Sequence, residues 1–238
     1  MTEPDSGISA PADSLSVSWS NVVRFVRQLS HDLRNHLNAV ELQSVYVNEL
    51  TEDAELKTEI KRMREMIAQP GIILQKLSAD LAKIKTNFIA YKAADFMEDV
   101  RRKFGNDFPE EAARMGWEIQ AGEATFDVDP QLLQQALFEL FANAFRHEAK
   151  GEALKVTAHA EKDCFVFTLE ELKAHFNLPT ENWGREPLRS VTQGHYGLGL
   201  NRVRGIVEAH SGDFRTQYDP ASSTLVTTIT LPLSATRS

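Results

Sequence analysis

The chain has 238 residues, which is enough for one large domain or two small ones with a buried core. Its 34 acidic and 26 basic residues give a net charge of −8, which argues against a basic face for nucleic acid. The single cysteine, Cys164, excludes an internal disulfide and fits a reducing compartment.

The N-terminal segment has the composition of a tail. Residues 1–14 are rich in Ser, Pro, Asp and Gly, which predicts disorder. They contain neither the basic region nor the apolar run of a signal peptide. No stretch of the sequence approaches the ~20 apolar residues that span a bilayer. We therefore expect a cytoplasmic protein without membrane insertion. If it belongs to a sensory pathway, its sensor lies on another chain or upstream of this one.

Residues 15–50 predict a long helix, because apolar residues recur at spacings of three and four. This first stripe consists of Trp19, Val22, Val26, Leu29, Leu33, Leu37 and Val40. The segment Thr51-Glu52-Asp53 breaks the pattern, and either Thr51 or Asp53 is suited to cap a second helix.

The second helix carries a heptad-like seam of alternating four- and three-residue steps. The seam consists of Leu56, Ile60, Met63, Ile67, Pro70, Leu74, Leu77, Leu81 and Ile84. Pro70 removes a backbone donor and predicts a kink. Two helices joined by a short turn form an antiparallel hairpin, and two hairpins bury their stripes by pairing into a four-helix bundle. Residues 15–88 are thus expected to be a dimerisation domain that makes the protein a homodimer.

Residues 89–238 predict a two-layer α/β sandwich, so the fold class is a helical hairpin followed by an α/β domain. Helices are expected over 94–104, 130–147 and 198–210, the second with Asp129 as its N-cap. Strands are expected over 117–120, 125–128, 154–160, 164–169, 213–218 and 224–231. The stretch 172–196 is long and irregular, and such loops are usually functional or mobile.

The first chemical motif is Ser30-His31-Asp32-Leu33-Arg34-Asn35-His36-Leu37. At about 100° per residue, His31 points nearly opposite the apolar stripe and should be exposed. A lone exposed histidine is usually plain surface. Here Asp32 can hold or deprotonate one imidazole nitrogen while the other attacks, and Asn35 lies four residues on, on the same helix face.

This motif resembles the H-box of sensor histidine kinases. The resemblance implies that His31 is phosphorylated, that Asp32 is its acid–base partner and that Asn35 serves in dephosphorylating a response regulator. The family usually has Pro where this chain has His36, which should straighten the helix. We expect His36 to be less accessible than His31, because it falls near the apolar seam.

The second motif lies in the helix predicted over residues 130–147. A buried amphipathic helix would explain its apolar face, but Glu139 and Asn143 are four residues apart and share another face. The pattern resembles the N-box of the ATPase fold shared by histidine kinases, gyrase-type and mismatch-repair ATPases. By that resemblance Glu139 and Asn143 hold Mg²⁺, Glu139 stands where some members have a catalytic Glu, and Arg146 or His147 reaches phosphate.

The third motif is Gly194-His195-Tyr196-Gly197-Leu198-Gly199-Leu200, before a predicted helix. Glycines at a helix start let backbone N–H groups approach phosphate. With the downstream Ala209-His210-Ser211-Gly212-Asp213, the segment resembles the second glycine box of the same family, although His195 replaces one glycine. Gly194, Gly197 and Gly199 are then the phosphate-binding glycines of an ATP site.

The first glycine box of the family, Asp-x-Gly-x-Gly, is missing. In the family, the Asp of this box accepts a hydrogen bond from the adenine amino group, and it should follow the strand at 164–169. Here the chain continues as Glu170-Glu171-Leu172-Lys173. Losing one charge-assisted hydrogen bond costs about 1.5–3 kcal/mol. Glu170 is the candidate substitute for this Asp, and ATP binding is expected to be weak.

Three functions compete. The resemblance favours a histidine-kinase core that uses ATP and Mg²⁺ to phosphorylate His31 and passes the group to an aspartate of a response regulator receiver domain. The missing glycine box favours a histidine phosphotransfer protein, charged by an upstream kinase, whose α/β domain only docks partners. A dimeric scaffold without activity leaves the His31-Asp32 pair unexplained.

Overall fold

A computed structural model describes most of the chain. The described residues are 18–146, 153–173, 176, 180, 183–185, 187–188 and 196–234. Their contacts divide the chain into two compact units, residues 1–79 and 80–238.

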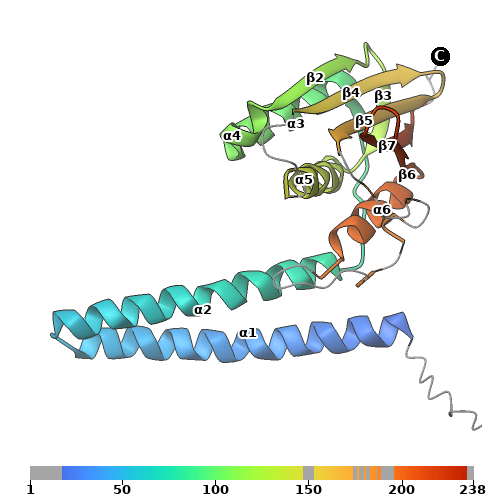
Figure 1. Ribbon diagram of the computed structural model, residues 1–238. Coiled ribbons are helices and arrows are strands. Elements are labelled where there is room, and N and C mark those ends of the chain that lie inside the picture. Colours follow the sequence, from blue (N-terminus) through green and yellow to red (C-terminus); the bar gives the residue numbers. More distant parts are fainter. Residues whose placement is uncertain are drawn as a thin grey trace, which may run out of the picture. The chain divides into compact units, whose positions relative to one another are not determined.

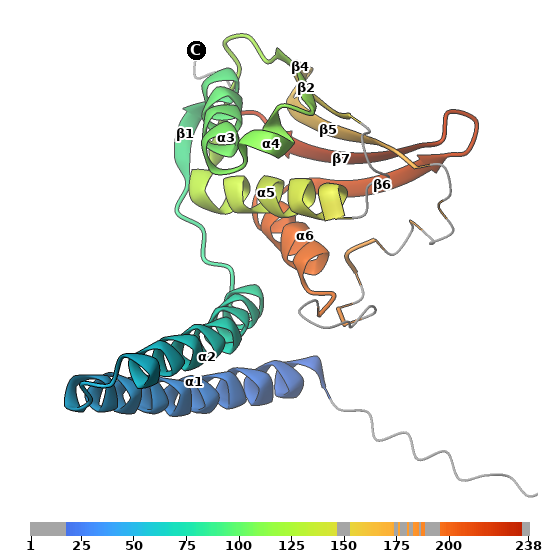
Figure 2. The same ribbon diagram turned by 60° about the vertical axis from the view of Figure 1, so that its left-hand side comes forward.

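The first unit is an antiparallel helical hairpin of α1 (Trp19–Leu50) and α2 (Ala54–Asp80), which lie side by side in Figures 1 and 2. Asp53 caps α2: its carboxylate accepts hydrogen bonds from the N–H groups of Glu55 at 2.8 Å and Leu56 at 3.2 Å. Across the hairpin, Arg64 Nη2 lies 3.5 Å from Glu41 Oε1. The helix α2 runs through Pro70 without interruption, so the expected kink stays a prediction.

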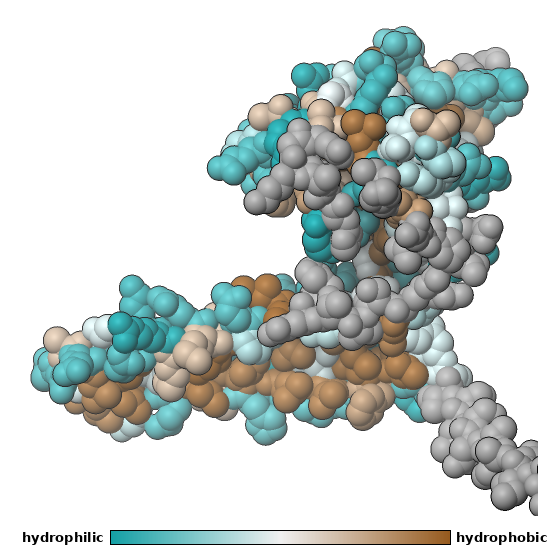
Figure 3. All heavy atoms as spheres, in the orientation of Figure 1, coloured by the Kyte–Doolittle hydropathy of each residue, from teal (hydrophilic) through white to brown (hydrophobic). Residues whose placement is uncertain are grey.

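Much of the apolar surface of the hairpin is left open. Among the described hydrophobic residues of this unit only Ile60 is buried. Figure 3 shows the apolar side chains as a band along the helices. Large apolar side chains that remain exposed include Leu29, Leu33, Val40, Leu42, Tyr46, Leu50, Leu56, Met63 and Ile72. No described helix of the chain is long and apolar enough to cross a membrane.

The second unit is the α/β domain. Its elements are β1 (Ile89–Lys92), α3 (Ala93–Asp107), α4 (Pro109–Ala112), β2 (Met115–Gln120), β3 (Thr125–Val128), α5 (Pro130–Arg146), β4 (Leu154–Glu161), β5 (Cys164–Leu172), α6 (Gly199–Ala209), β6 (Asp213–Asp219) and β7 (Thr224–Pro232). The sequence pattern predicts all of them except β1 and α4, which have four residues each. It also ends β5 three residues early.

A five-stranded sheet with the order β2-β4-β5-β7-β6 forms one layer, and β1 and β3 pair separately. Only β2 and β4 are parallel within this sheet. The helices α3, α5 and α6 cover one face, as Figure 2 shows. On that inner face Phe165, Phe167 and Leu169 of β5 are buried, which gives the strict alternation expected of a half-covered strand.

Asp129 fixes the start of α5. Its carboxylate accepts hydrogen bonds from the N–H groups of Gln131, Leu132 and Asn87, so it caps α5 and fastens the segment before β1. Its own N–H donates to the buried His210 Nε2 at 3.0 Å. The predicted N-cap is therefore present, and it connects the start of α5 to the end of α6.

Candidate functional site

His31 lies on the open surface of α1, and 65% of its side chain is exposed. Its Nδ1 is 3.2 Å from Asp32 Oδ1, and Gln28 Nε2 donates to the same oxygen at 2.8 Å. An ionised carboxylate only accepts hydrogen bonds, so contact with Asp32 requires a proton on Nδ1. The lone pair then resides on Nε2, which is the nitrogen free to attack an electrophile.

Asn35 contacts the same ring nitrogen with the opposite preference. Its Nδ2 lies 3.4 Å from His31 Nδ1 and can donate only if Nδ1 is unprotonated. The carboxylate of Asp32 and the amide N–H of Asn35 therefore select different tautomers of His31. The three residues predicted as one cluster on α1 are together in the structure.

His36 is also exposed in the single chain, contrary to the expectation that it would be less accessible. Accessibility therefore does not separate the two histidines. The adjacent carboxylate does, because no described acidic side chain pairs with His36. Of the other histidines, His159 lies 3.9 Å from Glu161 and His210 is buried, while His147, His175 and His195 lie outside the described residues.

The predicted phosphate and metal residues of α5 lie on successive turns of that helix. Glu139 and Asn143 are half-buried and Arg146 is exposed. A β-carbon added to Gly199 would lie 2.1 Å from Glu139 Oε1, so the Glu139 carboxylate packs directly against the first residue of α6. The structure thus joins the two motifs that the sequence separates by about sixty residues.

The start of α6 depends on glycine. Gly197 has a φ of +63°, a left-handed conformation that glycine adopts without strain. Gly199 has no room for a side chain beside Glu139. The first backbone N–H groups of a helix have no partner within the helix, so those at the start of α6 are suited to phosphate oxygens. Gly194, the remaining glycine of the predicted phosphate-binding set, lies outside the described residues.

The end of β5 departs from the expectation for Glu170. Glu170 lies on the outer face of the sheet, where it is only partly buried, whereas Glu171 points inward and is 5% exposed. Burial raises the pKa of Glu171, and the nearby Lys173 opposes that rise. Lys173 Nζ lies 3.1 Å from Glu171 Oε2. The inward carboxylate beyond the core residues is therefore Glu171, which the sequence analysis did not single out.

The described residues fit the phosphates and metal of a nucleotide better than they fit its base. The carboxylate of Glu139 and the amide of Asn143, beside the glycine start of α6, are suited to Mg²⁺ and phosphate oxygens. The Glu171 carboxylate, the group available for a base amino group, already pairs with Lys173.

Comparison with known proteins agrees with this arrangement. Residues 128–235 match the family described as histidine kinase-, DNA gyrase B- and HSP90-like ATPase. An uncharacterized sensor-like histidine kinase of Rhizobium meliloti is 23% identical over 89% of this chain and 43% of its own length. The sensor histidine kinase SpaK of Bacillus subtilis is 28% identical over 36% of this chain and 20% of its own length. The chain thus spans less than half the length of these relatives.

Solved structures show the same fold. Full-length ShkA in complex with AMPPNP aligns with a TM-score of 0.68 at 18% identity, over 90% of this chain and 47% of that one. The histidine kinase ThkA in complex with the response regulator protein TrrA aligns with a TM-score of 0.56 at 18% identity, over 90% of this chain and 62% of that one. The predicted fold class, a helical hairpin followed by an ATPase-type α/β domain, is confirmed.

Proposed function

We propose that this chain, which has a histidine-kinase core, carries a phosphoryl group on His31 and passes it to an aspartate of a response regulator receiver domain. The observation that carries the proposal is the exposed His31, whose Nδ1 lies against Asp32 and whose Nε2 is open. The hairpin is the dimerisation and phosphotransfer domain, and the α/β domain is the ATPase-type domain.

The chemistry follows from the tautomer that Asp32 selects. The lone pair of His31 Nε2 attacks phosphorus, a P–N bond forms, and the P–O bond to the leaving group breaks. Asp32 stabilises the positive charge that develops on the ring, or accepts the Nδ1 proton. In the second transfer a receiver carboxylate attacks phosphorus and the P–N bond breaks. Asn35, beside the same ring, is placed to position a water or the receiver carboxylate.

The donor that we propose is ATP with Mg²⁺. Glu139 and Asn143 would hold the metal, Arg146 and His147 would contact phosphate, and Gly194, Gly197 and Gly199 would present backbone N–H groups. Mg²⁺ supplies charge neutralisation between the phosphates. The packing of Glu139 against Gly199 supports this assignment, because it brings the metal-binding and phosphate-binding motifs into one place.

A second candidate function is phosphotransfer without ATP. In that case an upstream kinase phosphorylates His31, and the α/β domain serves as a docking module. The observation in its favour is the Glu171–Lys173 pair, which occupies the carboxylate that would otherwise be available to a base.

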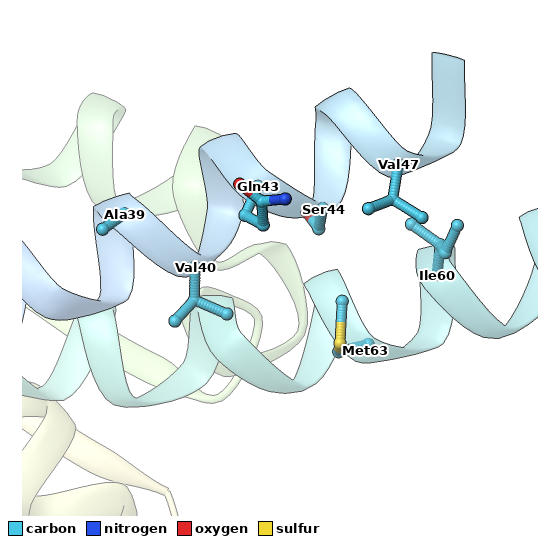
Figure 4. Close-up of a pocket in the computed structure, with 7 residues that line it drawn as sticks. All are labelled: Ala39, Val40, Gln43, Ser44, Val47, Ile60 and Met63. Atoms are coloured by element: carbon cyan, nitrogen blue, oxygen red, sulfur yellow. The ribbon is translucent and has the colours of Figure 1, made fainter. Parts of the chain in front are cut away.

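We also propose that two copies pair through their hairpins into a four-helix bundle. The support is the apolar groove lined by Ala39, Val40, Gln43, Ser44, Val47, Ile60 and Met63, drawn in Figure 4. A second hairpin would cover this groove and the exposed apolar side chains beside it.

The deciding experiment is phosphoryl labelling of the purified chain from two donors, labelled ATP with Mg²⁺ and a labelled, phosphorylated receiver domain. Label on His31 should be acid-labile and base-stable. Label from ATP supports the kinase, and label from the receiver alone supports the phosphotransfer protein.

His31→Gln should abolish label from both donors, while leaving stability within about 0.5 kcal/mol because the residue is exposed. His36→Gln is the matched control, since it changes an exposed histidine on the same helix that lacks a carboxylate partner. Full labelling of the His31→Gln variant would contradict the proposal.

A further inference from the structure

Glu171 is a buried acidic group that the proposed phosphoryl transfer does not use. It is the last inward-facing residue of β5, and it pairs across the sheet with Leu225 of β7, which in turn pairs with Tyr218 of β6. All three side chains lie on the inner face, so Glu171 and Tyr218 stand on either side of Leu225 in one row. An isolated buried carboxylate is costly unless a donor compensates it.

Lys173 provides that compensation from within the chain. Its ammonium lies 3.1 Å from the Glu171 carboxylate, and only 10% of its side chain is exposed. The backbone of Lys173 is fastened at both ends: its N–H donates to Ser223 O at 2.7 Å, and its carbonyl accepts from the Tyr218 hydroxyl at 2.9 Å. These bonds hold the backbone of Lys173 beside Glu171, while its ammonium is held only through the side chain.

Aromatic rings continue from this row. The ring of Phe176 lies 5.4 Å from that of Tyr218 and 5.5 Å from that of Trp183, between ring centroids. Glu171 and Tyr218 lie on the same face of the sheet with Leu225 between them. Such a buried carboxylate is chemically suited to accept a hydrogen bond from the exocyclic amino group of a flat heterocycle that stacks on a nearby ring. In this structure a lysine ammonium stands where such an amino group would bind.

We propose that Lys173 is an internal competitor for a nucleobase amino group at Glu171, and that it sets a low affinity of the domain for adenine nucleotides. This inference rests on the proposed nucleotide site on α5 and α6. The ligand must displace the ammonium before its amino group reaches the carboxylate, so its apparent affinity falls by the fraction of molecules in which Lys173 has moved away.

Competition by Lys173 and simple electrostatics predict opposite changes in ATP affinity when the lysine is removed. Removing a lysine lowers the positive potential of the domain and should weaken the binding of a polyanion. If Lys173 competes for the base, removing it should instead strengthen the binding of ATP. The two explanations are therefore separable by the sign of one change.

The experiment is calorimetry on the full chain with Mg–ATP and, separately, with magnesium tripolyphosphate, which has no base. Lys173→Ala should tighten ATP binding about tenfold and leave tripolyphosphate binding unchanged or weaker. Lys173→Gln, which keeps a neutral donor near Glu171, should give a smaller gain and covers the case in which the Ala variant fails to fold. Lys155→Ala is the control, because Lys155 pairs with the exposed Glu118 on the outer face of the same sheet.

The gain should disappear when Glu171→Gln is added to Lys173→Ala, because the carboxylate is the proposed acceptor. Folded Lys173 variants with unchanged or weaker ATP binding would overturn the inference, as would an equal gain for tripolyphosphate. Labelling of His31 from a phosphorylated receiver domain needs no nucleotide and should be unaffected, so a failure of the proposed phosphotransfer function would be seen separately.

Discussion

The hairpin and the α/β domain bury apolar surface very differently. The α/β domain encloses a continuous core in which aromatic side chains of α3, α5 and β5 contact one another. The hairpin buries one large apolar side chain, Ile60, among its described residues and leaves bulky ones in solvent. The described part of the α/β domain therefore buries its apolar side chains within the chain, whereas the hairpin leaves an apolar surface of the kind that the proposed pairing of two hairpins would cover.

The largest effect is expected from a charge placed in the apolar groove of the hairpin. Val47→Asp should convert a dimer to monomers, because an unpaired buried charge costs about 3–5 kcal/mol, which is a hundredfold or more in the dimer dissociation constant. Light scattering across a concentration series measures it. Asn38→Asp is the control, since residue 38 lies about 160° around the helix from Val40 and about 180° from Val47. Equal dissociation of both variants, or a wild-type monomer at tens of micromolar, would contradict the dimer.

The core of the α/β domain can be tested at the buried ion pair between Glu171 and Lys173 on the inner face of the sheet. Glu171→Leu and Lys173→Met should each destabilise the chain by about 3–5 kcal/mol, because each removes one partner of a buried ion pair, whereas the double variant should be near neutral. Urea denaturation gives the double-mutant cycle. The exposed pair Lys155–Glu118 should show a coupling of only about 0.2–1 kcal/mol. Additive losses at Glu171 and Lys173 would argue against a coupled pair.

The join between α5 and α6 is tested at Gly199. Gly199→Ala should cost about 1–3 kcal/mol by overpacking, because the new β-carbon would meet the Glu139 carboxylate. It should also weaken Mg–ATP binding in calorimetry, since Glu139 must move. Gly105→Ala in α3 is the matched control: nothing lies within 4 Å of its added β-carbon, so stability should rise by about 0.5–1 kcal/mol. A gain in stability from both variants would show that the Glu139 side chain moves aside at little cost.

The smallest expected effect concerns the cap of α5. Asp129→Ala should cost about 1 kcal/mol in thermal or urea unfolding, and Asp127→Ala, an exposed neighbour, less than about 0.5 kcal/mol. Burial alone would raise the pKa of Asp129, but hydrogen bonds from the N–H groups of Leu132, Asn87 and Gln131 lower it overall.

The pKa of Asp129 in the folded chain is below the unfolded value of about 3.9. The stability that its carboxylate adds is therefore fully present above the unfolded pKa. It is lost as the pH falls through the folded pKa. The stability difference between wild type and Asp129→Ala should therefore shrink in acid. A difference that is constant from pH 7 to pH 2 would show that the carboxylate charge contributes nothing.

How far the sequence predicts each site depends on how local the site is. His31, Asp32 and Asn35 lie within one helical turn or so, and helix geometry alone puts them together. The joining of Glu139 to Gly199 needs the packing of two distant helices, so only the resemblance to known motifs could suggest it.

The end of β5 shows where local reasoning fails. A strand alternates its faces, so an error of one residue exchanges inside for outside. Continuing the alternation of Phe165, Phe167 and Leu169 by one more step leads to Glu171, and this signal was available in the sequence. Ending the strand at Leu169 hid it. The ion pair between Lys173 and Glu171 has no such signal in the sequence, because the position of Lys173 depends on tertiary contacts with Ser223 and Tyr218.

The pairing of β5 with β7 also determines how the two units of this protein can fold. Contacts within the hairpin join neighbouring helices through a three-residue turn, whereas Cys164 pairs with Pro232, near the end of the described chain. Distant pairings must close long loops before they gain any contact, and such topologies fold slowly. The centre of the sheet can therefore form only after residue 232 is available, while the hairpin that carries His31 needs only residues up to the end of α2. In pulse-labelling hydrogen exchange, amides of α1 should gain protection before those of β5.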